Sequence, residues 1–163
     1  MEGRLDPRDG WSAGPCSIAA ALEILSTRSA FLILREAFYG AVRFDEFVRR
    51  SAISEQVAAA RLQELVDHGL LAREPYRDPG QRTRRHYRLT AKGSDLFPVL
   101  VALMQWGDRW REDAGPPVEL RHRECGATVG VELRCAAGHD LAARDLLLAP
   151  TPAGEAWLGR SGN

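Results

Sequence analysis

A short stretch of this chain gathers positive charge in a way that suits binding to a polyanion. Residues 79–93, PGQRTRRHYRLTAKG, hold five arginine or lysine side chains and no carboxylate. Residues 73–92 hold seven basic side chains and two acidic ones, a local net charge of +5, although the whole chain has 22 of each sign. Charge concentrated in this way is typical of a nucleic-acid site, because phosphate groups are the partners that such a cluster attracts.

Sulfur and imidazole groups form a second set of residues with useful chemistry. Cys16 stands just before a predicted helix, where the helix dipole favours the reactive thiolate, so it is a candidate redox-sensing residue. The alternative is that Cys16 is only a half-buried small residue in the interface between two subunits. His122, Cys125, Cys135 and His139 follow the spacing H-x2-C-x9-C-x3-H, which fits a tetrahedral zinc set on a small β-ribbon. The alternative there is a ribbon that does not bind metal, and no other cofactor is expected.

Hydrophobic periodicity predicts the helices that must position these groups. Apolar residues recur at helical spacing over four segments, residues 17–27, 28–40, 43–50 and 54–68. Ser54 is suited to cap the fourth helix and Gly69 to end it. On that helix we expect the core to be reached by Val57, Leu62, Leu65 and Val66.

The segment after residue 69 predicts a β-hairpin followed by one long helix. Residues 70–76 and 82–90 read as strands, joined by a turn with Pro-Gly signals. On the returning strand, Arg85, Tyr87 and Leu89 alternate onto the inward face, and Arg84, His86 and Arg88 onto the outward face. Residues 90–110 predict a helix capped by Thr90, with so much apolar surface that we expect it to pack against another subunit.

Composition predicts the organisation of the chain. Residues 1–15 read as a flexible arm, 16–115 as the main domain, 116–150 as a small tail of two or three short strands, and 151–163 as disordered. The sequence has no run of eighteen apolar residues, no signal-peptide layout and an odd number of cysteines, which favours a soluble cytoplasmic protein with reduced thiols. Its frequent Ala, Arg, Gly and Leu suit a bacterium with GC-rich DNA.

Three of these helices, followed by the two-stranded hairpin, have the layout of a winged helix-turn-helix domain. The predicted fold class is therefore α+β, mainly α, with a long C-terminal dimerisation helix and a small β-rich tail. In a winged helix, a helix with a small polar face enters the major groove, and the basic tip of the hairpin reaches phosphate or the minor groove.

Four motifs, in order, resemble the HxlR family of bacterial winged-helix transcription regulators, within the MarR-like superfamily. They are CSIAAALEIL, LILREAFYGAVRFDEF, ISEQVAAARLQELVDHGLLAREPY and RRHYRLTAKGSDLFPVLVALMQWG, and the resemblance covers residues 16–110. It implies a homodimer, joined by the N-terminal and long C-terminal helices, that binds a palindromic operator in double-stranded DNA. We expect a repressor that responds to oxidant or electrophile stress.

The resemblance also implies which residues contact DNA. Ser54 to Arg61 would form the leading half of the recognition helix, with Ser54, Gln56 and Arg61 as base readers, because glutamine pairs with adenine and arginine with guanine. The alanines at 58–60 would let the helix approach the groove. The expected DNA-binding residues are Arg43, Ser54, Glu55, Gln56, Ala58, Arg61, Arg82, Thr83, Arg84 and Arg85, the last four on the wing.

Several positions match or depart from the family pattern. Cys16 matches a family cysteine that some members use as a sensor. Ser29 stands where a tryptophan usually opens the second helix, and Arg85 stands where the strand is usually apolar, so this wing is more basic than is typical. Gly138 occupies the place of the last cysteine in the tail of longer members, with His139 one residue later.

Two other functions are the alternatives. A small zinc or thiol enzyme would use Cys125 or Cys135 with a histidine, but the sequence shows no third orienting group, nucleophile elbow or glycine-rich phosphate loop, so we expect no catalytic residues. A winged helix used only for protein contacts would lack the basic wing. Loss of affinity for duplex DNA as salt rises distinguishes DNA binding from both.

Overall fold

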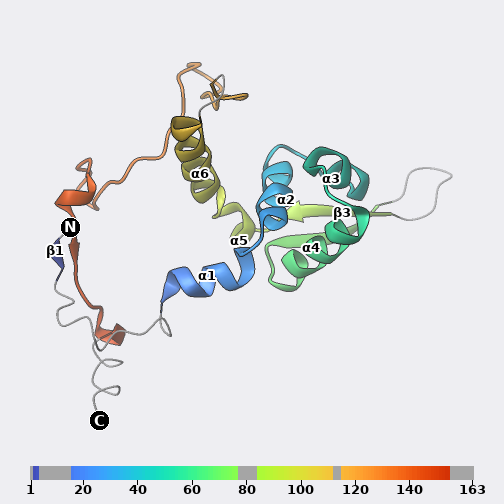
Figure 1. Ribbon diagram of the computed structural model, residues 1–163, viewed down its shortest axis with the longest axis horizontal. Helices are drawn as coiled ribbons and strands as arrows, with labels where there is room; N and C mark the ends of the chain where they lie inside the picture. The colour runs from blue at the N-terminus through green and yellow to red at the C-terminus, as the bar shows by residue number, and fades with distance from the viewer. Residues whose placement is uncertain (1, 4–15, 77–83, 112–114, 155–163) are drawn as a thin grey trace, which may run out of the picture. The chain divides into compact units, whose positions relative to one another are not determined.

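The computed structural model describes residues 2–3, 16–76, 84–111 and 115–154. They form two compact units: Glu23–Gly130, and the described residues on either side of that range. The larger unit contains α2 (Arg28–Phe38), α3 (Phe44–Ser51), α4 (Glu55–Asp67), β2 (Leu71–Tyr76), β3 (Arg84–Leu89), α5 (Ala91–Ser94) and α6 (Phe97–Trp110) (Figure 1). This is the predicted order of helices followed by a hairpin, and the fold is mainly helical with a two-stranded sheet.

A further helix, α1 (Ser17–Leu25), precedes α2. It begins directly after Cys16, whose carbonyl oxygen accepts a hydrogen bond from the Ala20 N–H at 3.0 Å. Among the described residues no single helix has the length and apolar composition to cross a bilayer, and α1 and α2 meet both criteria only as a pair bent by 82°.

Apolar side chains of α2 form the centre of the core. Ile33 and Leu34 are completely buried, and they share one cluster with Phe47, Leu62 and Leu71. Helices α3 and α4 and the hairpin therefore pack around α2, as Figure 1 shows.

Hydrogen-bonding side chains fix where α2 begins. The Thr27 hydroxyl oxygen accepts a hydrogen bond from the Ala30 N–H at 3.2 Å, as an N-cap residue does. Ser29, which stands in the place of the family tryptophan, donates to the Thr27 hydroxyl at 3.3 Å. The serine thus supports the cap and supplies none of the apolar packing that a tryptophan would.

The hairpin is tied to the segment that leads into α3. Strands β2 and β3 pair antiparallel, with Arg73 opposite Tyr87. The Tyr87 N–H also donates to the Val42 carbonyl at 2.8 Å, and Arg43 forms a β-bridge with His86. Residues 42–43 are therefore attached to β3 by one isolated bridge and one backbone hydrogen bond, while the sheet itself stays two-stranded.

The segment after the hairpin forms two helices, where one long helix was predicted. Thr90 caps α5, since its hydroxyl accepts a hydrogen bond from the Gly93 N–H at 3.0 Å. However, α5 ends at Ser94 and α6 begins at Phe97. Pro98 explains the break, because proline has no N–H to bond the Ser94 carbonyl and its ring would clash with that carbonyl. Proline is tolerated in the first turn of a new helix, where Pro98 lies.

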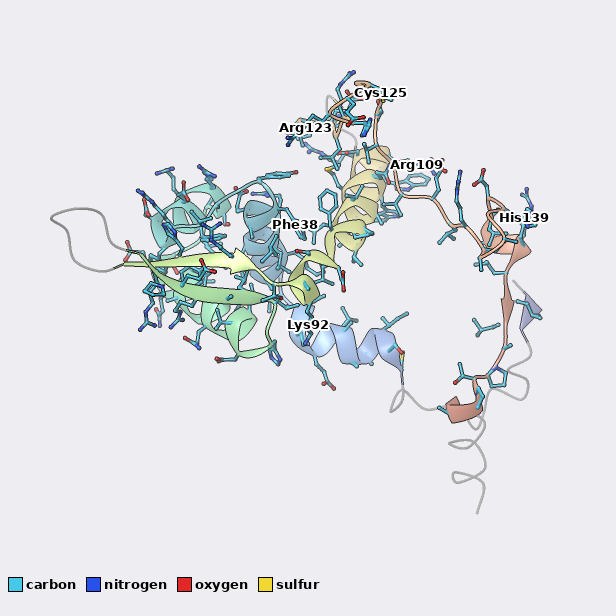
Figure 2. All side chains as sticks on the ribbon, turned by 180° about the vertical axis from the view of Figure 1, so that it is seen from behind. Phe38, Lys92, Arg109, Arg123, Cys125 and His139 are labelled. Atoms are coloured by element: carbon cyan, nitrogen blue, oxygen red, sulfur yellow. The ribbon has the colours of Figure 1, made fainter. Side chains whose placement is uncertain are left out.

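Helix α6 packs on α2 with one side and exposes apolar side chains on another. The rings of Phe38 and Phe97 lie 4.9 Å apart, and Figure 2 shows Phe38 on the side of α2 that faces α6. An apolar cavity of about 270 Å³ lies between the two helices. Leu103 is 48% exposed, and Trp106 and Trp110 are each 67% exposed. The predicted excess of apolar surface on this helix is therefore present.

The tail is less regular than the strands predicted for it. Residues 118–149 contain two isolated β-bridges, a short 3-10 helix (Ala143–Asp145) and β4 (Leu147–Leu148), which pairs in parallel with β1 (Glu2–Gly3). Residues 152–154 are helical where disorder was predicted. Residues 155–163 of that predicted disordered segment, and residues 1 and 4–15 of the predicted arm, lie outside the described residues.

Gly93→Ala is expected to destabilise the protein. An added Cβ would lie 2.1 Å from the Leu70 carbonyl oxygen, a backbone atom at the junction of α4 and β2. Overpacking of this kind costs about 1–3 kcal/mol or more, which a urea titration would report as a lower free energy of unfolding.

Gly107→Ala is the matched control for this change. Gly107 lies inside α6 with nothing within 4 Å of an added Cβ. Alanine is favoured over glycine inside a helix by about 1 kcal/mol, so this variant should be as stable as the parent or more stable. A Gly93→Ala protein as stable as Gly107→Ala would contradict the close packing at residue 93.

Candidate nucleic-acid interface

A stripe of buried side chains sets the rotation of α4 about its axis. Ala58, Leu62 and Leu65 are at most 1% exposed and follow the spacing of one helix face. Ala58 was predicted to contact DNA and Val57 to face the core. The structure corrects both, because Ala58 is fully buried and Val57 is 40% exposed. The face of α4 opposite this stripe is the one available to a partner.

That opposite face is small and polar. Gln56, Ala60 and Gln63 are exposed on it, with Ala59 exposed at its edge. Short side chains of this kind let the axis of a helix come close to the floor of a DNA groove. Gln56, the predicted adenine reader, lies on the available face, and its role in reading DNA stays a prediction.

Ser54 and Glu55 stand at the N-terminus of α4. The Ser54 hydroxyl oxygen accepts a hydrogen bond from the Val57 N–H at 3.3 Å, so the predicted cap is confirmed. The hydroxyl hydrogen of Ser54 can still be donated to a base or phosphate. Glu55 is exposed in the first turn, where a carboxylate suits the helix dipole.

Arg61, the predicted guanine reader, is engaged within its own helix. Its guanidinium pairs with the Glu64 carboxylate three residues later, and the two side chains are 29% and 47% exposed. Partly exposed pairs of this kind contribute little to stability. The guanidinium can therefore exchange Glu64 for another acceptor at small cost.

Arg43 is exposed at the N-cap position of α3, next to a carboxylate that organises the turn. The Glu46 carboxylate accepts hydrogen bonds from the Val42 and Arg43 backbone N–H groups, both at 3.0 Å, and from Arg50 at 3.2 Å. These two backbone hydrogen bonds hold the pKa of Glu46 below its ordinary value, and the one from Val42 has the larger effect. Glu46 thereby fixes the chain that presents Arg43.

The predicted wing residues are described only in part. Arg85 is exposed and makes no ion pair within the described part of the chain. Arg85 was predicted to face inward on β3. It is exposed because it lies two residues before Tyr87, which is the buried residue of that strand. Arg84 lies in β3 opposite Tyr76. Arg82 and Thr83 lie outside the described residues.

Two other cations of the basic cluster have partners within the domain. Arg88 donates to the Glu74 carboxylate at 2.9 Å across the hairpin, with both side chains more than half exposed. The Lys92 ammonium donates to the His68 carbonyl at the end of α4, at 2.8 Å. A cation at a helix C-terminus is favourable for the helix dipole. The cluster thus contains both stabilising cations and a cation, Arg85, exposed to solvent.

A chain of side chains that the sequence analysis did not identify connects α4 to the hairpin. The guanidinium of Arg73 donates to the Gln63 side chain and lies 5.5 Å above the Tyr87 ring. The Tyr87 ring in turn meets Phe47 of α3 edge to face, with the centroids 6.0 Å apart. The signal that could have found it is that Arg73 and Tyr87 lie on the two predicted strands of the hairpin, where the structure pairs them. These contacts fix the hairpin relative to both helices.

Cys16 is half-buried and directly precedes the first residue of α1, as predicted. In the tail, His122 and Cys125 approach to 3.1 Å between Nδ1 and Sγ, and Cys135 and His139 approach to 3.4 Å between the same atom types. No group of three or more His, Cys, Asp or Glu side chains gathers around one point in the part of the chain that the structure describes. The predicted four-ligand zinc set therefore stays a prediction.

Comparisons with known proteins agree on one kind of protein. The model of the HxlR-like helix-turn-helix family matches residues 24–114. An uncharacterized HTH-type transcriptional regulator of Mycobacterium tuberculosis is 41% identical over 147 residues, which are 89% of this chain and 92% of the relative. The crystal structure of a candidate transcription factor, PA1607, superposes with a TM-score of 0.74 at 35% identity, over 83% of this chain and 95% of the other. The redox regulator HypR in its oxidized form superposes with a TM-score of 0.55 at 25% identity, over 60% of this chain and all of HypR.

Glu46→Gln is expected to reduce stability in a pH-dependent way. Because the folded-state pKa of Glu46 is lowered, its contribution is complete above the ordinary value of 4.5 and is lost as pH falls through the lowered pKa. At pH 7 the variant should lose about 1–2 kcal/mol of unfolding free energy, since a neutral amide accepts weaker hydrogen bonds than a carboxylate. The difference from the parent should vanish in acid, below the lowered pKa. Glu124→Gln, at an exposed tail position, is the control, and an equal loss at every pH would contradict the account.

Proposed function

The chain belongs to the HxlR-like helix-turn-helix family of transcriptional regulators, and from that premise we propose that it is a homodimeric repressor that binds a palindromic operator in double-stranded DNA. The observation that supports this proposal most strongly is the small, polar, exposed face of α4 beside a basic hairpin. In a chain with no net charge, this is where a polyanion finds an excess of cations.

The proposed role of α4 is to read bases in the major groove. Gln56 lies on the exposed face, and its amide can both donate to and accept from the edge of adenine. Arg61 would leave Glu64 and donate two hydrogen bonds to guanine. Ser54 keeps its capping role, so its DNA contact would be made through the hydroxyl hydrogen.

The proposed role of the hairpin is to hold the DNA backbone. Arg85, together with Arg82, Thr83 and Arg84, would contact phosphate or the minor groove beside α4. Arg43, joined to β3 by its bridge with His86, adds a cation at the base of the wing. Because phosphates are the same at every base pair, these contacts give affinity without sequence preference.

The proposed dimer would use the apolar surface that one protomer leaves in water. Ile18 and Leu22 of α1 are 71% and 50% exposed, and Trp106 and Trp110 of α6 are each 67% exposed. Large exposed apolar groups on neighbouring turns of a helix are typical of protein interfaces. Two copies of the chain would present two α4 helices to the two half-sites of an operator.

Cys16 is the proposed sensor of oxidants or electrophiles. It is half-buried at the start of α1, a helix proposed to lie in the dimer interface. The redox regulator HypR, which superposes on this chain, supports a role of this type. Modification of the thiol would alter the packing of α1 and so the spacing of the two recognition helices.

The alternative of a small thiol or zinc enzyme has less support. The family consists of transcriptional regulators, and we propose that Cys125 and Cys135 have no catalytic role. Because the proposed target is chromosomal DNA, we also propose a cytoplasmic location.

Two substitutions should separate base reading from phosphate binding. Gln56→Ala should relax the preference at one base position, at a cost of about 1–3 kcal/mol on the preferred site. Arg85→Ala should weaken binding to all sequences by a similar factor. Binding is measured by electrophoretic shift on the region upstream of the gene and on a set of single-base variants of it.

Arg88→Ala is the matched control on the same strand, because its guanidinium is already paired with Glu74. It should weaken DNA binding less than Arg85→Ala does. If Arg85→Ala instead changed base preference and left total affinity intact, the proposed role of the wing would be wrong.

Diamide treatment tests the role of Cys16. The parent protein should lose operator binding when treated with this thiol oxidant, and Cys16→Ser should retain it. Equal release of both proteins from the operator would exclude Cys16 as the sensor.

A further inference from the structure

The cavity between α2 and α6 is a feature of the larger unit that the proposed function does not use. Its volume is about 270 Å³, and its wall is made by side chains of the two helices together with Leu120. All of these residues belong to the unit Glu23–Gly130. An apolar cavity of about 150 Å³ is large enough to bind benzene, so the cavity between α2 and α6 has room for two fused rings.

The wall of the cavity is apolar and rich in aromatic rings. Phe31 and Phe38 of α2 line the cavity, as does Phe97 of α6. The Phe38 and Phe97 rings lie 4.9 Å apart at an interplanar angle of 44°, and Figure 2 labels Phe38. Aromatic rings in tilted or offset contact are more stable than the burial of their area alone explains, so this wall favours an aromatic ligand.

Arg35 is the charged residue at the wall, and its charge is already balanced. Its Nε and Nη2 groups donate to one oxygen of the Glu36 carboxylate, at 2.8 and 2.6 Å. The Glu36 side chain is only 7% exposed, and separating a buried carboxylate from its partner is costly. Arg35 therefore stays with Glu36, and a charged ligand would lose its hydration at the wall without gaining a partner. The cavity thus suits an uncharged ligand.

Tyr39 offers the cavity a hydrogen-bond donor. Its hydroxyl donates to the sulfur of Met104 at 4.0 Å, and both residues line the cavity. A thioether sulfur is a weak acceptor, so an oxygen of a ligand in its place would accept a stronger hydrogen bond. A ligand with an oxygen at the edge of its ring system therefore fits this wall.

The cavity is separate from the part of α6 that is proposed for the dimer interface. Trp106 and Trp110, each 67% exposed, are not among the residues that line it. Val101 does line the cavity and is only 3% exposed, so the cavity reaches the interior of the domain. A helix of a second copy, about 10–12 Å in diameter with its side chains, does not enter a recess of this volume. A small molecule is therefore the occupant that fits, since ligand pockets are concave and mostly apolar.

We propose that this cavity binds a small uncharged aromatic molecule of about two fused rings, with an oxygen that accepts a hydrogen bond from the Tyr39 hydroxyl. The ring system would contact Phe31, Phe38 and Phe97, and the oxygen would replace the sulfur of Met104 as the acceptor. The binding is non-covalent. The site is additional to the proposed DNA-binding function and does not depend on it.

Equilibrium dialysis of the full-length chain against naphthalene derivatives tests the class of ligand. The parent should bind one molecule of 1-naphthol per chain and should bind 1-naphthoate about 10-fold more weakly or less, because the carboxylate loses its hydration. Tyr39→Phe should weaken 1-naphthol binding by about 3–10-fold, the effect of one hydrogen bond, and leave the binding of naphthalene unchanged. Failure of the parent to bind 1-naphthol, equal affinity for 1-naphthoate, or no effect of Tyr39→Phe would each overturn the proposal.

A matched pair of substitutions on α6 tests the place of binding. Val101→Phe adds a ring at the wall of the cavity and should abolish saturable binding of 1-naphthol. Val99→Phe adds the same ring at a position that is 44% exposed and does not line the cavity, so it should bind like the parent. Circular dichroism and a urea titration show whether both variants are folded. Binding by a folded Val101→Phe protein would place 1-naphthol on the exposed surface of α6 and overturn the proposal.

The same dialysis at several protein concentrations tests the other occupant, a second copy of the chain. The affinity for 1-naphthol should be independent of protein concentration. An affinity that falls as the protein associates would assign the cavity to the second copy and contradict the proposal. DNA binding is measured separately on the same samples, so failure of the ligand site is distinguishable from failure of the proposed function.

Discussion

The burial of three side chains of α4 determines what the rest of this domain can do. Ala58, Leu62 and Leu65 are in the core, and a helix has only one face opposite such a stripe. Because Ala58 is small, α4 lies close to its neighbours in the core, and Gln56, Ala60 and Gln63 are left outside. Burying a leucine side chain contributes about 1.5–3 kcal/mol, which far exceeds what any exposed contact of α4 contributes. The core therefore selects the face that meets a partner.

The hairpin depends on the same core through Tyr87. Its ring meets Phe47 and lies under the guanidinium of Arg73, which also donates to Gln63 on α4. The basic cluster thus combines two roles, since Arg73, Arg88 and Lys92 stabilise the domain while Arg85 is exposed. An exposed ion pair is worth at most about 1 kcal/mol, whereas release of counterions from DNA favours each phosphate contact at low salt. In the proposed function, Arg85 is therefore a cation of this cluster that would contribute to DNA binding, because it forms no ion pair with a carboxylate among the described residues.

Local signals in the sequence were sufficient for the order of elements and for the caps at Ser54 and Thr90. They were insufficient where tertiary packing decides between neighbouring positions. Val57 and Ala58 both fit a helical pattern, and only the packing around α2 shows that the smaller residue is buried. Pro98 indicated a break before α6, but the apolar periodicity around it predicted one continuous helix. In the candidate site, the exposure of Gln56 was predictable from spacing. Spacing placed Arg85 on the inward face of its strand, whereas the structure exposes it beyond the buried part of that strand. The link from Gln63 through Arg73 to Tyr87 required the three-dimensional register.

The most direct test of the central claim, that the exposed face of α4 and the adjoining hairpin form a DNA-binding surface, is the salt dependence of binding to duplex DNA from upstream of the gene. The logarithm of the binding constant should fall linearly with the logarithm of salt concentration, with a slope of about −0.9 for each phosphate contact. With about 6–10 phosphate contacts for the dimer, affinity should fall by about 10³–10⁵ between about 50 and 200 mM salt. Absence of binding at low salt, or an affinity that does not change with salt, would contradict the account.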